Sequence, residues 1–229
     1  MNWNPPPKPA DLSESRLIRA ILEDLFPIDS NLPPERELAA SLGVTRPTLR
    51  EVLQRLAQEG WLEIRQGKPT RVRNYWREGN LGVLATIVQY PNHLPTGFPA
   101  DMLAVRSLLA PAFTRLAVAH AASQVVDLLL PYQNLEDDPL IFTAWDWRLQ
   151  IELTLLSGNP VFTLIYNSFA GLYQLLGVAY FRQPNNRRLS RQFYLHLLAC
   201  AEVHDELAAE QVVLSMMQTT QRLWEQVRL

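Results

Sequence analysis

Apolar residues recur at helical spacing near the start of the chain, between positions 12 and 26. In "LSESRLIRAILEDLF" five of them fall on one face of a helix: Leu17, Ile18, Ile21, Leu22 and Leu25. Ser13 stands just before this run, at a position suited to an N-cap. The pattern predicts a first helix whose apolar face packs against a core.

Proline, threonine and glycine mark the ends of two more predicted helices. Pro34 falls in the first turn of the second helix, where a missing N–H costs nothing, and Gly43 ends that helix. Thr45 is a good N-cap for the third helix, and Gly60 ends it. The positions expected to face the core are Leu38 and Leu42, then Leu49, Val52, Leu53 and Leu56.

After the third helix the pattern changes from helical spacing to alternation. In "WLEIRQGKPTRVRNYW", Leu62 and Ile64 alternate with Trp61, Glu63 and Arg65. The letters "QGKP" then form a turn, and "TRVRN" alternates again. This pattern predicts a two-stranded hairpin with a basic tip.

Residues 12–74 therefore have the element order of a winged helix-turn-helix domain, a fold that binds DNA. The formal net charge of the whole chain is −2, but residues 31–77 hold nine basic and five acidic groups, a balance of +4. The remainder of the chain is then at −6. A basic segment joined to an acidic body suggests that one part of the chain meets a polyanion.

Basic and hydroxyl side chains gather where such a domain enters the major groove, at the start of the third helix. Arg46 and Arg50 are four residues apart and share a face, and arginine is the usual bidentate reader of guanine. Thr45 and Thr48 can reach backbone or bases. The remaining candidates for DNA contact are Arg36 on the preceding helix, for a phosphate, and Gln66, Gly67 and Lys68 at the hairpin tip, for the minor groove.

Three further arginines have simpler interpretations. Arg55 has Glu51 four residues before it and Glu59 four residues after it, so we expect solvated pairs within the helix. Arg71 and Arg73 are either exposed strand residues or phosphate contacts, and the sequence leaves both interpretations open.

Beyond residue 74 the chain is predicted to be helical. Residues 75–97 are expected to form a linker with one short helix near 80–89, and residues 98–229 an all-α bundle of six or seven helices. Pro111 predicts a kink or a break. The expected fold class is thus mainly α, with an N-terminal winged helix-turn-helix joined to an all-α effector domain.

The segment 160–181 is apolar and about as long as a bilayer-spanning helix. Because it carries polar residues in its interior, a buried bundle helix is the favoured interpretation. Its Tyr166, Tyr173 and Tyr180 are spaced seven apart and lie nearly on one stripe. They are either core aromatics or the walls of a cavity for a long apolar ligand.

Other features bound the compartment and the chemistry. The Pro-rich residues 1–11 are expected to be a disordered tail and lack the apolar core of a signal peptide. The single cysteine, Cys200, fits a reducing compartment, so we expect a cytoplasmic protein without a membrane span. The four histidines are scattered and no nucleophile or dinucleotide motif occurs, so we expect no metal, no cofactor and no enzymatic activity.

The stretch "LPPERELAASLGVTRPTLREVLQRLAQEGWLEIRQGKPTRV" resembles the DNA-binding domain of the GntR family of bacterial regulators. The resemblance continues through "NYW", "AVRSLL", "SGNP", "GLY", "YF" and "RLW", and is greatest to the fatty-acid-responsive branch of that family. It implies a sequence-specific transcriptional regulator that acts as a homodimer on operator DNA. It also implies operator contacts by Arg36, Arg46, Arg50 and Gly67, with Thr45 and Thr48 supporting them.

The same resemblance implies a cavity for a long-chain acyl-CoA that modulates operator binding. The residues that match its lining are Arg106, Tyr173, Tyr180 and Trp224. In the segment "MMQTTQRLW", Met217, Thr219 and Thr220 stand where the branch has a polar, Gly-containing segment. This departure keeps two alternatives open: another small organic acid as effector, or none. A more remote alternative is a lipid carrier or enzyme with an incidental basic domain.

Overall fold

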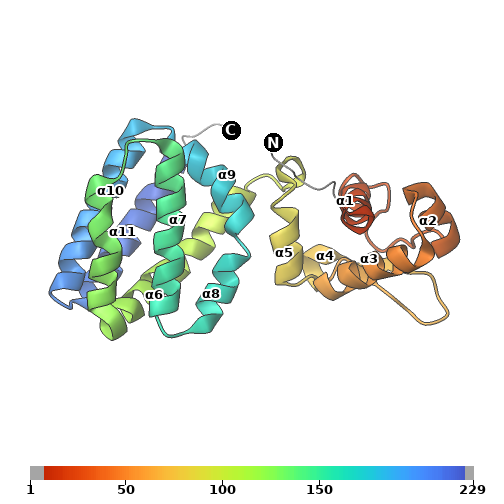
Figure 1. Ribbon diagram of the computed structural model, residues 1–229, viewed down its shortest axis with the longest axis horizontal. Helices are drawn as coiled ribbons and strands as arrows, with labels where there is room; N and C mark the ends of the chain where they lie inside the picture. Colours follow the sequence, from red (N-terminus) through yellow and green to blue (C-terminus); the bar gives the residue numbers. More distant parts are fainter. Residues whose placement is uncertain (1–7, 225–229) are drawn as a thin grey trace. The chain divides into compact units, whose positions relative to one another are not determined.

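The computed structural model describes residues 8–224, and the chain divides into two compact units between His93 and Leu94 (Figure 1). Each unit has its own buried apolar core. Positions 1–7 of the predicted tail, and positions 225–229 at the end of the predicted bundle, lie outside the described residues.

The described part of the N-terminal unit contains three α-helices, a small sheet and a short helical extension. The helices are α1 (Pro9–Leu22), α2 (Glu35–Leu42) and α3 (Arg46–Glu59). The strands β1 (Leu62–Glu63) and β2 (Arg71–Val72) pair antiparallel, with Leu62 opposite Val72. The extension consists of α4 (Tyr75–Glu78), α5 (Leu81–Ile87) and the 3₁₀ turn η1 (Pro91–His93).

The apolar stripes of the three helices form the core of this unit, as the spacing predicts. All four inward positions of α3 are buried, and α1 contributes Leu17, Ile18 and Ile21. Burying each such side chain contributes roughly 1.5–3 kcal/mol. At the other predicted positions, Leu38 is buried and Leu42 and Leu22 are half-buried. Leu25 is 70% exposed because α1 ends at Leu22, before the stripe reaches it.

The start of α1 differs from the expectation. The helix begins at Pro9, inside the predicted disordered tail, because proline is well suited to the first helical turn. Ser13 is therefore not an N-cap. It is buried within the helix, and its hydroxyl donates to the Pro9 carbonyl oxygen at 2.8 Å.

The turn between α2 and α3 follows the predicted end signals. Gly43 ends α2 with a φ of 72°, in the left-handed region that favours glycine, and Gly60 ends α3 with a φ of 101°. Pro34 is the residue just before α2 instead of lying in its first turn. This short connection holds α3 across α2 in the helix-turn-helix arrangement.

The hairpin forms where predicted, but its alternation is shorter than the sequence indicates. Leu62 is buried as expected, whereas Ile64 is 49% exposed because β1 ends at Glu63. Trp61, expected on the outer side, is fully buried against the ring of Tyr75, with the ring centroids 4.8 Å apart. The indole of Trp61 thus joins the hairpin to the following helix.

The segment predicted as a linker is helical and packs on α3. The Asn80 amide donates to the Gln58 carbonyl oxygen at 3.0 Å, and the Thr86 hydroxyl donates to Glu59 at 2.9 Å. The backbones also approach closely, since a Cβ added at Gly60 would lie 3.0 Å from the Gly79 Cα. Helices α4 and α5 therefore pack on the N-terminal helices, and the compact N-terminal unit extends through them to His93.

The described part of the C-terminal unit is a bundle of six α-helices with one 3₁₀ turn (Figure 1). They are α6 (Phe98–Leu129), η2 (Leu130–Asn134), α7 (Pro139–Leu156), α8 (Pro160–Asn167), α9 (Ala170–Phe181), α10 (Pro184–Glu202) and α11 (Glu206–Trp224). Helix α6 packs along α11, α7 and α10. The Arg187 guanidinium joins the start of α7 to the end of α9, because it donates both to Asp137 before α7 and to the Phe181 carbonyl oxygen.

Of the kink or break predicted at Pro111, the break does not occur. Pro111 lies buried inside α6, and the backbone leaves helical dihedral angles at Ala121 instead, with a φ of −148°. Packing against neighbouring helices supports the turn that lacks the proline hydrogen bond. The interruption lies next to His120, whose Nδ1 is 3.0 Å from the Ser157 carbonyl oxygen between α7 and α8.

The segment 160–181 is also not the single helix that was predicted. It divides into α8 and α9, which are bent by 71°. By length and composition, the segment Phe98–Asn134 is apolar enough to cross a membrane, and the bent pair passes only if it counts as one span. Helices of a bundle can pass the same test, and α6 packs against α11, α7 and α10, although only 33% of the apolar window is buried.

Candidate functional site

The N-terminus of α3 presents a capped helix end and exposed basic side chains. Thr45 has an extended backbone, and its Oγ1 accepts a hydrogen bond from the Thr48 backbone N–H at 3.3 Å. The two threonine hydroxyl oxygens are 2.9 Å apart. Arg46 begins the helix and is exposed, and the first turn carries no acidic residue. The positive end of the helix is therefore open to an anion.

Arg50, one turn further along, is exposed but paired. Its Nε donates to the Glu35 carboxylate on α2 at 2.8 Å, and the two side chains are 65% and 41% exposed. An exposed pair of this kind contributes roughly 0.2–1 kcal/mol, so a phosphate or a base can displace Glu35. Arg36, the next residue on α2, is exposed as well.

The tip of the hairpin is exposed at all three predicted positions, Gln66, Gly67 and Lys68. Gly67 has a φ of 70°, a conformation that costs glycine little, and a Cβ at this position would meet no atom within 4 Å. The Lys68 N–H donates to the Arg65 carbonyl oxygen at 3.3 Å and closes the turn. This geometry leaves the tip free to enter a groove.

Arg55 has a structural role, but only one of its two predicted partners is correct. Its guanidinium lies 3.5 Å from Glu51 on its own helix, and 3.3 and 3.1 Å from Asp11 and Glu14 on α1. Glu59, the other predicted partner, accepts instead from the Trp61 indole at 3.2 Å and from α5. Arg55 therefore links α3 to α1 by ion pairs and is not available to contact DNA.

A cavity of about 70 Å³ lies inside the C-terminal unit, which is room for several water molecules. Its walls are mainly apolar and come from α6, α7, α8, α9, α10 and α11. All six residues predicted to bind the ligand line it: Arg106, Tyr173, Tyr180, Met217, Thr220 and Trp224. The fold thus brings the six predicted residues, from three separate helices, to one cavity.

A buried carboxylate, Asp146 on α7, forms the polar centre of this cavity. Its Oδ2 is 3.4 Å from an Arg106 Nη and accepts a hydrogen bond from the Tyr173 hydroxyl. Its Oδ1 accepts from the Tyr194 hydroxyl at 2.8 Å. The Arg106 guanidinium also lies over the Tyr173 ring, 5.2 Å from its centroid. One buried charge is therefore compensated by one cation and two hydroxyl donors.

The tyrosines of this centre remain protonated at ordinary pH. Burial, reinforced by the negative charge of Asp146, raises the pKa of the Tyr173 and Tyr194 hydroxyls well above the usual 10.0. The hydroxyls of Tyr166 and Tyr180 are buried without a hydrogen bond of ordinary geometry, as is the Arg106 Nε. Tyr166 lies beside Arg106, and Tyr180 beside Thr220 and Ser190, so these groups form a polar patch that can meet the polar part of a ligand.

Comparison with known proteins matches both units. The sequence model of the GntR family of bacterial regulatory proteins matches residues 14–72, and that of the FadR C-terminal domain matches residues 73–229. Two relatives named fatty acid metabolism regulator protein come from Shewanella frigidimarina and Shewanella sp. MR-4. The first is 42% identical over 85% of this chain and 81% of its own, and the second 39% identical over 96% and 91%.

The chain belongs to the GntR family, with a FadR-type C-terminal domain.

A solved structure has a related fold. It is described as "Lar controls the expression of the Listeria monocytogenes agr system and mediates virulence", and its TM-score is 0.63 with 13% identity over 98% of this chain and 100% of that chain.

As a GntR-family protein the chain is a DNA-binding transcriptional regulator and not an enzyme. The predicted fold class is confirmed.

Sequence reasoning missed the centre of the cavity of this FadR-type domain. Neither Asp146 nor Tyr194 was among the residues predicted to bind the ligand. The one available signal was a lone aspartate within the apolar segment "FTAWDWRLQ", since a charge in such a place needs partners. Within residues 8–224, no three or more His, Cys, Asp or Glu side chains are grouped so that they could hold a metal ion.

Proposed function

We propose that this GntR-family chain is a cytoplasmic, homodimeric regulator of fatty-acid metabolism whose binding to operator DNA is modulated by a long-chain acyl-CoA. The observation that carries the proposal is the cavity, in which apolar walls from several helices surround Arg106 and a few buried hydroxyls. The names of the Shewanella relatives support fatty-acid metabolism as the regulated process.

The DNA part of the proposal places the N-terminus of α3 in the major groove. Arg46 and Arg50 read base edges or phosphates, and Thr45 and Thr48 support the helix end. Arg36 holds a neighbouring phosphate, and the hairpin tip with Gln66, Gly67 and Lys68 enters the minor groove.

The ligand part of the proposal uses the apolar walls for an acyl chain. Tyr173, Tyr180 and Trp224 supply flat aromatic surface, and Met217 supplies a flexible side chain that adapts to the ligand. Arg106 and the hydroxyls of the cavity, including that of Thr220, meet the polar part of the ligand.

Coupling between the two functions follows from linkage. The cavity has a volume of about 70 Å³, far below the 300–1,000 Å³ typical of ligand pockets, so a long chain must displace lining side chains. A ligand that fits only the displaced arrangement shifts the population toward it. If that arrangement sets the two recognition helices of the dimer at a spacing that no longer matches the half-sites, operator affinity falls.

Dimerisation is part of the same proposal. One winged helix-turn-helix domain makes a small interface with DNA, and a two-fold dimer binds a palindrome with two such domains. Sedimentation equilibrium of the free chain tests this point, with twice the chain mass of 26.2 kDa as the expected result. A monomer at micromolar concentration would exclude it.

Another small organic acid is the alternative effector. It is favoured by Met217 and Thr220, which line the cavity where the FadR branch has a polar, Gly-containing segment. The Met217 side chain adds apolar bulk to this wall of the cavity. An effector shorter than a long acyl chain then has an advantage.

Trp147 and Trp224 line the cavity, so the binding test uses tryptophan fluorescence. We expect saturable quenching by oleoyl-CoA and none by free CoA. Oleate is the further control: quenching by oleate would show that the acyl chain is sufficient for binding without the thioester. For DNA, we expect the chain to enrich a specific duplex from a random library. Arg46→Ala should then weaken binding by roughly 1–3 kcal/mol. No quenching by either lipid would reject the acyl-CoA effector, and no enrichment would reject operator reading.

A further inference from the structure

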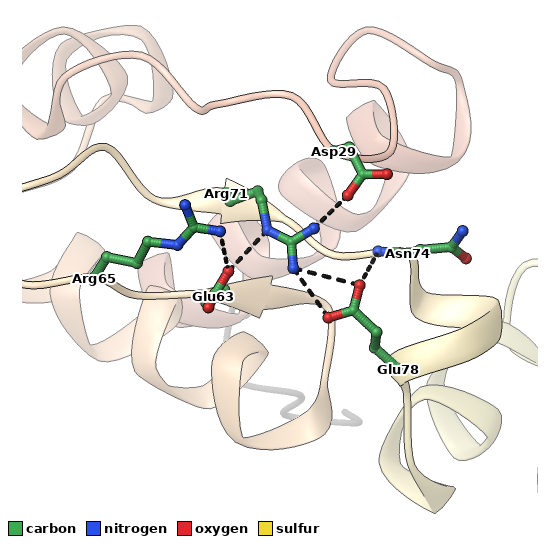
Figure 2. Close-up of polar contacts among 6 residues, drawn as sticks. All are labelled: Asp29, Glu63, Arg65, Arg71, Asn74 and Glu78. Carbon is green, nitrogen blue, oxygen red and sulfur yellow. Dashed lines mark hydrogen bonds and ion pairs between the residues drawn. The ribbon is translucent and has the colours of Figure 1, made fainter.

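Arg71, in strand β2 of the hairpin, is surrounded by three carboxylates from three different elements (Figure 2). Its Nε donates to Glu63 on β1 at 2.8 Å, and one Nη donates to Asp29 in the loop between α1 and α2. The other Nη donates to both carboxylate oxygens of Glu78 on α4, at 3.0 and 3.3 Å. The Arg71 side chain is only 18% exposed.

This cluster coincides with a set of backbone hydrogen bonds at the base of the hairpin. The Asp29 N–H donates to the Val72 carbonyl oxygen at 2.9 Å, and the Val72 N–H donates back to Ser30 at 2.8 Å. The Leu32 N–H donates to the Thr70 carbonyl oxygen at 2.8 Å. Residues 29–32 therefore lie along β2 as a third, irregular edge of the sheet, and Arg71 fastens that edge from the side.

The carboxylates of the cluster have further partners, which fix them in turn. Glu63 also accepts from Arg65 at 2.5 Å, and Glu78 accepts from the Asn74 backbone N–H at 3.2 Å (Figure 2). Hydrogen bonds from Arg65 and Arg71 lower the pKa of Glu63 to about 2, so this carboxylate is charged at neutral pH. Glu78 reaches the cluster from the helix that follows the hairpin.

Arg71 is thus unsuited to the phosphate contact that its sequence position allows. Every nitrogen of its guanidinium that carries a hydrogen already donates to a carboxylate. A phosphate approaching it also meets three negative side chains. By contrast, Lys68 at the tip of the same hairpin is exposed.

We infer that Arg71 is a positioning residue, which locks the base of the hairpin to α4 and to the α1–α2 loop so that Gln66, Gly67 and Lys68 are presented to DNA in one orientation. Operator affinity then depends on Arg71 although it does not touch DNA. Individual exposed pairs are weak, but here one fork joins three elements, so its loss releases all three together. This inference rests on the proposed reading of DNA by the N-terminal unit.

The test compares Arg71→Gln, Glu78→Gln and their double variant in the full chain, with Lys68→Gln as the matched control. The probe is a duplex that the wild-type chain selects from a random library, and its affinity is measured by fluorescence anisotropy over a series of salt concentrations. We expect each single variant to bind the duplex roughly five-fold more weakly than the wild type. The affinity of the double variant should be no lower than that of the single variant with the lower affinity.

The salt dependence separates positioning from contact. Arg71→Gln should leave the slope of log affinity against log salt unchanged, whereas Lys68→Gln should reduce it by about one. A slope reduced by about one in Arg71→Gln would show a direct phosphate contact and overturn the inference. Unchanged affinity in both Arg71→Gln and Glu78→Gln would overturn it as well.

Hydrogen exchange provides a measurement that needs no DNA. The Leu32 and Val72 amides at the base of the hairpin should exchange faster in Arg71→Gln and in Glu78→Gln, and at the wild-type rate in Lys68→Gln. Wild-type exchange at these amides in Arg71→Gln would refute the lock even if the wild-type chain selects no duplex. A failure of the proposed function alone would leave the exchange result as predicted.

Discussion

Replacing Asp146 by asparagine should destabilise the C-terminal unit strongly, because it removes the one negative charge of a buried cluster. Arg106 is 14% exposed and Asp146 only 7%, so the guanidinium that remains stays largely out of bulk water. Tyr173 and Tyr194 lose a charged acceptor, and a hydrogen bond to a charged group contributes about 1.5–3 kcal/mol. Breaking a buried pair from one side costs about 3–5 kcal/mol, a large part of the whole stability of a domain.

The assay is urea unfolding followed by tryptophan fluorescence and far-ultraviolet circular dichroism. Asp127→Asn is the matched control, because it makes the same chemical change at an exposed position of α6 and should shift the unfolding free energy by less than about 0.5 kcal/mol. Replacing both charges, as Asp146→Leu with Arg106→Met, should recover part of the loss. A cost below about 1 kcal/mol for Asp146→Asn, or a double variant less stable than Asp146→Asn, would refute this account of the cluster.

Three further predictions concern the helix cap, the α2–α3 pair and pH. Thr45→Ala should destabilise the N-terminal unit by about 1 kcal/mol in urea unfolding, since the Thr48 N–H loses its acceptor, while Thr219→Ala, at a half-buried site within α11, should cost less. Glu35→Gln should strengthen DNA binding a few-fold in anisotropy titrations because it frees Arg50 and removes a negative charge; weaker binding would contradict this. Burial raises the pKa of the Tyr173 and Tyr194 hydroxyls above 10.0. The stability that these groups contribute is therefore complete below pH 10 and is lost as the pH rises further. The midpoint of urea unfolding should fall above pH 10, and this fall should be less steep in Tyr194→Phe.

The N-terminal unit was largely predictable from the sequence because its signals are local. Thr45 and Gly60 mark the ends of α3, and the stripe from Leu49 to Leu56 fixes its buried face. Where local signals were weak, the prediction was wrong. Ser13 and Pro9 are both acceptable near a helix start, and Ile64 lies one residue beyond a very short strand.

The partners of charged side chains were less predictable, because they come from distant parts of the chain. Arg71 meets Asp29 across 42 positions, and no periodicity in the sequence connects them. Asp146 likewise meets Arg106 and Tyr194 only after the bundle has formed. The cavity residues were predicted by family resemblance, whereas their polar centre follows only from the three-dimensional arrangement.

One measurement tests the central claim most directly: release of the selected duplex by oleoyl-CoA, followed by anisotropy at fixed salt, in the wild type and two variants. Leu176 lines the cavity, and Leu175 beside it is 46% exposed. We predict that oleoyl-CoA releases the duplex from the wild type and from Leu175→Trp, that Leu176→Trp binds the duplex but does not respond, and that free CoA has no effect. Equal release from both variants would contradict the account, because the effector would then act outside this cavity.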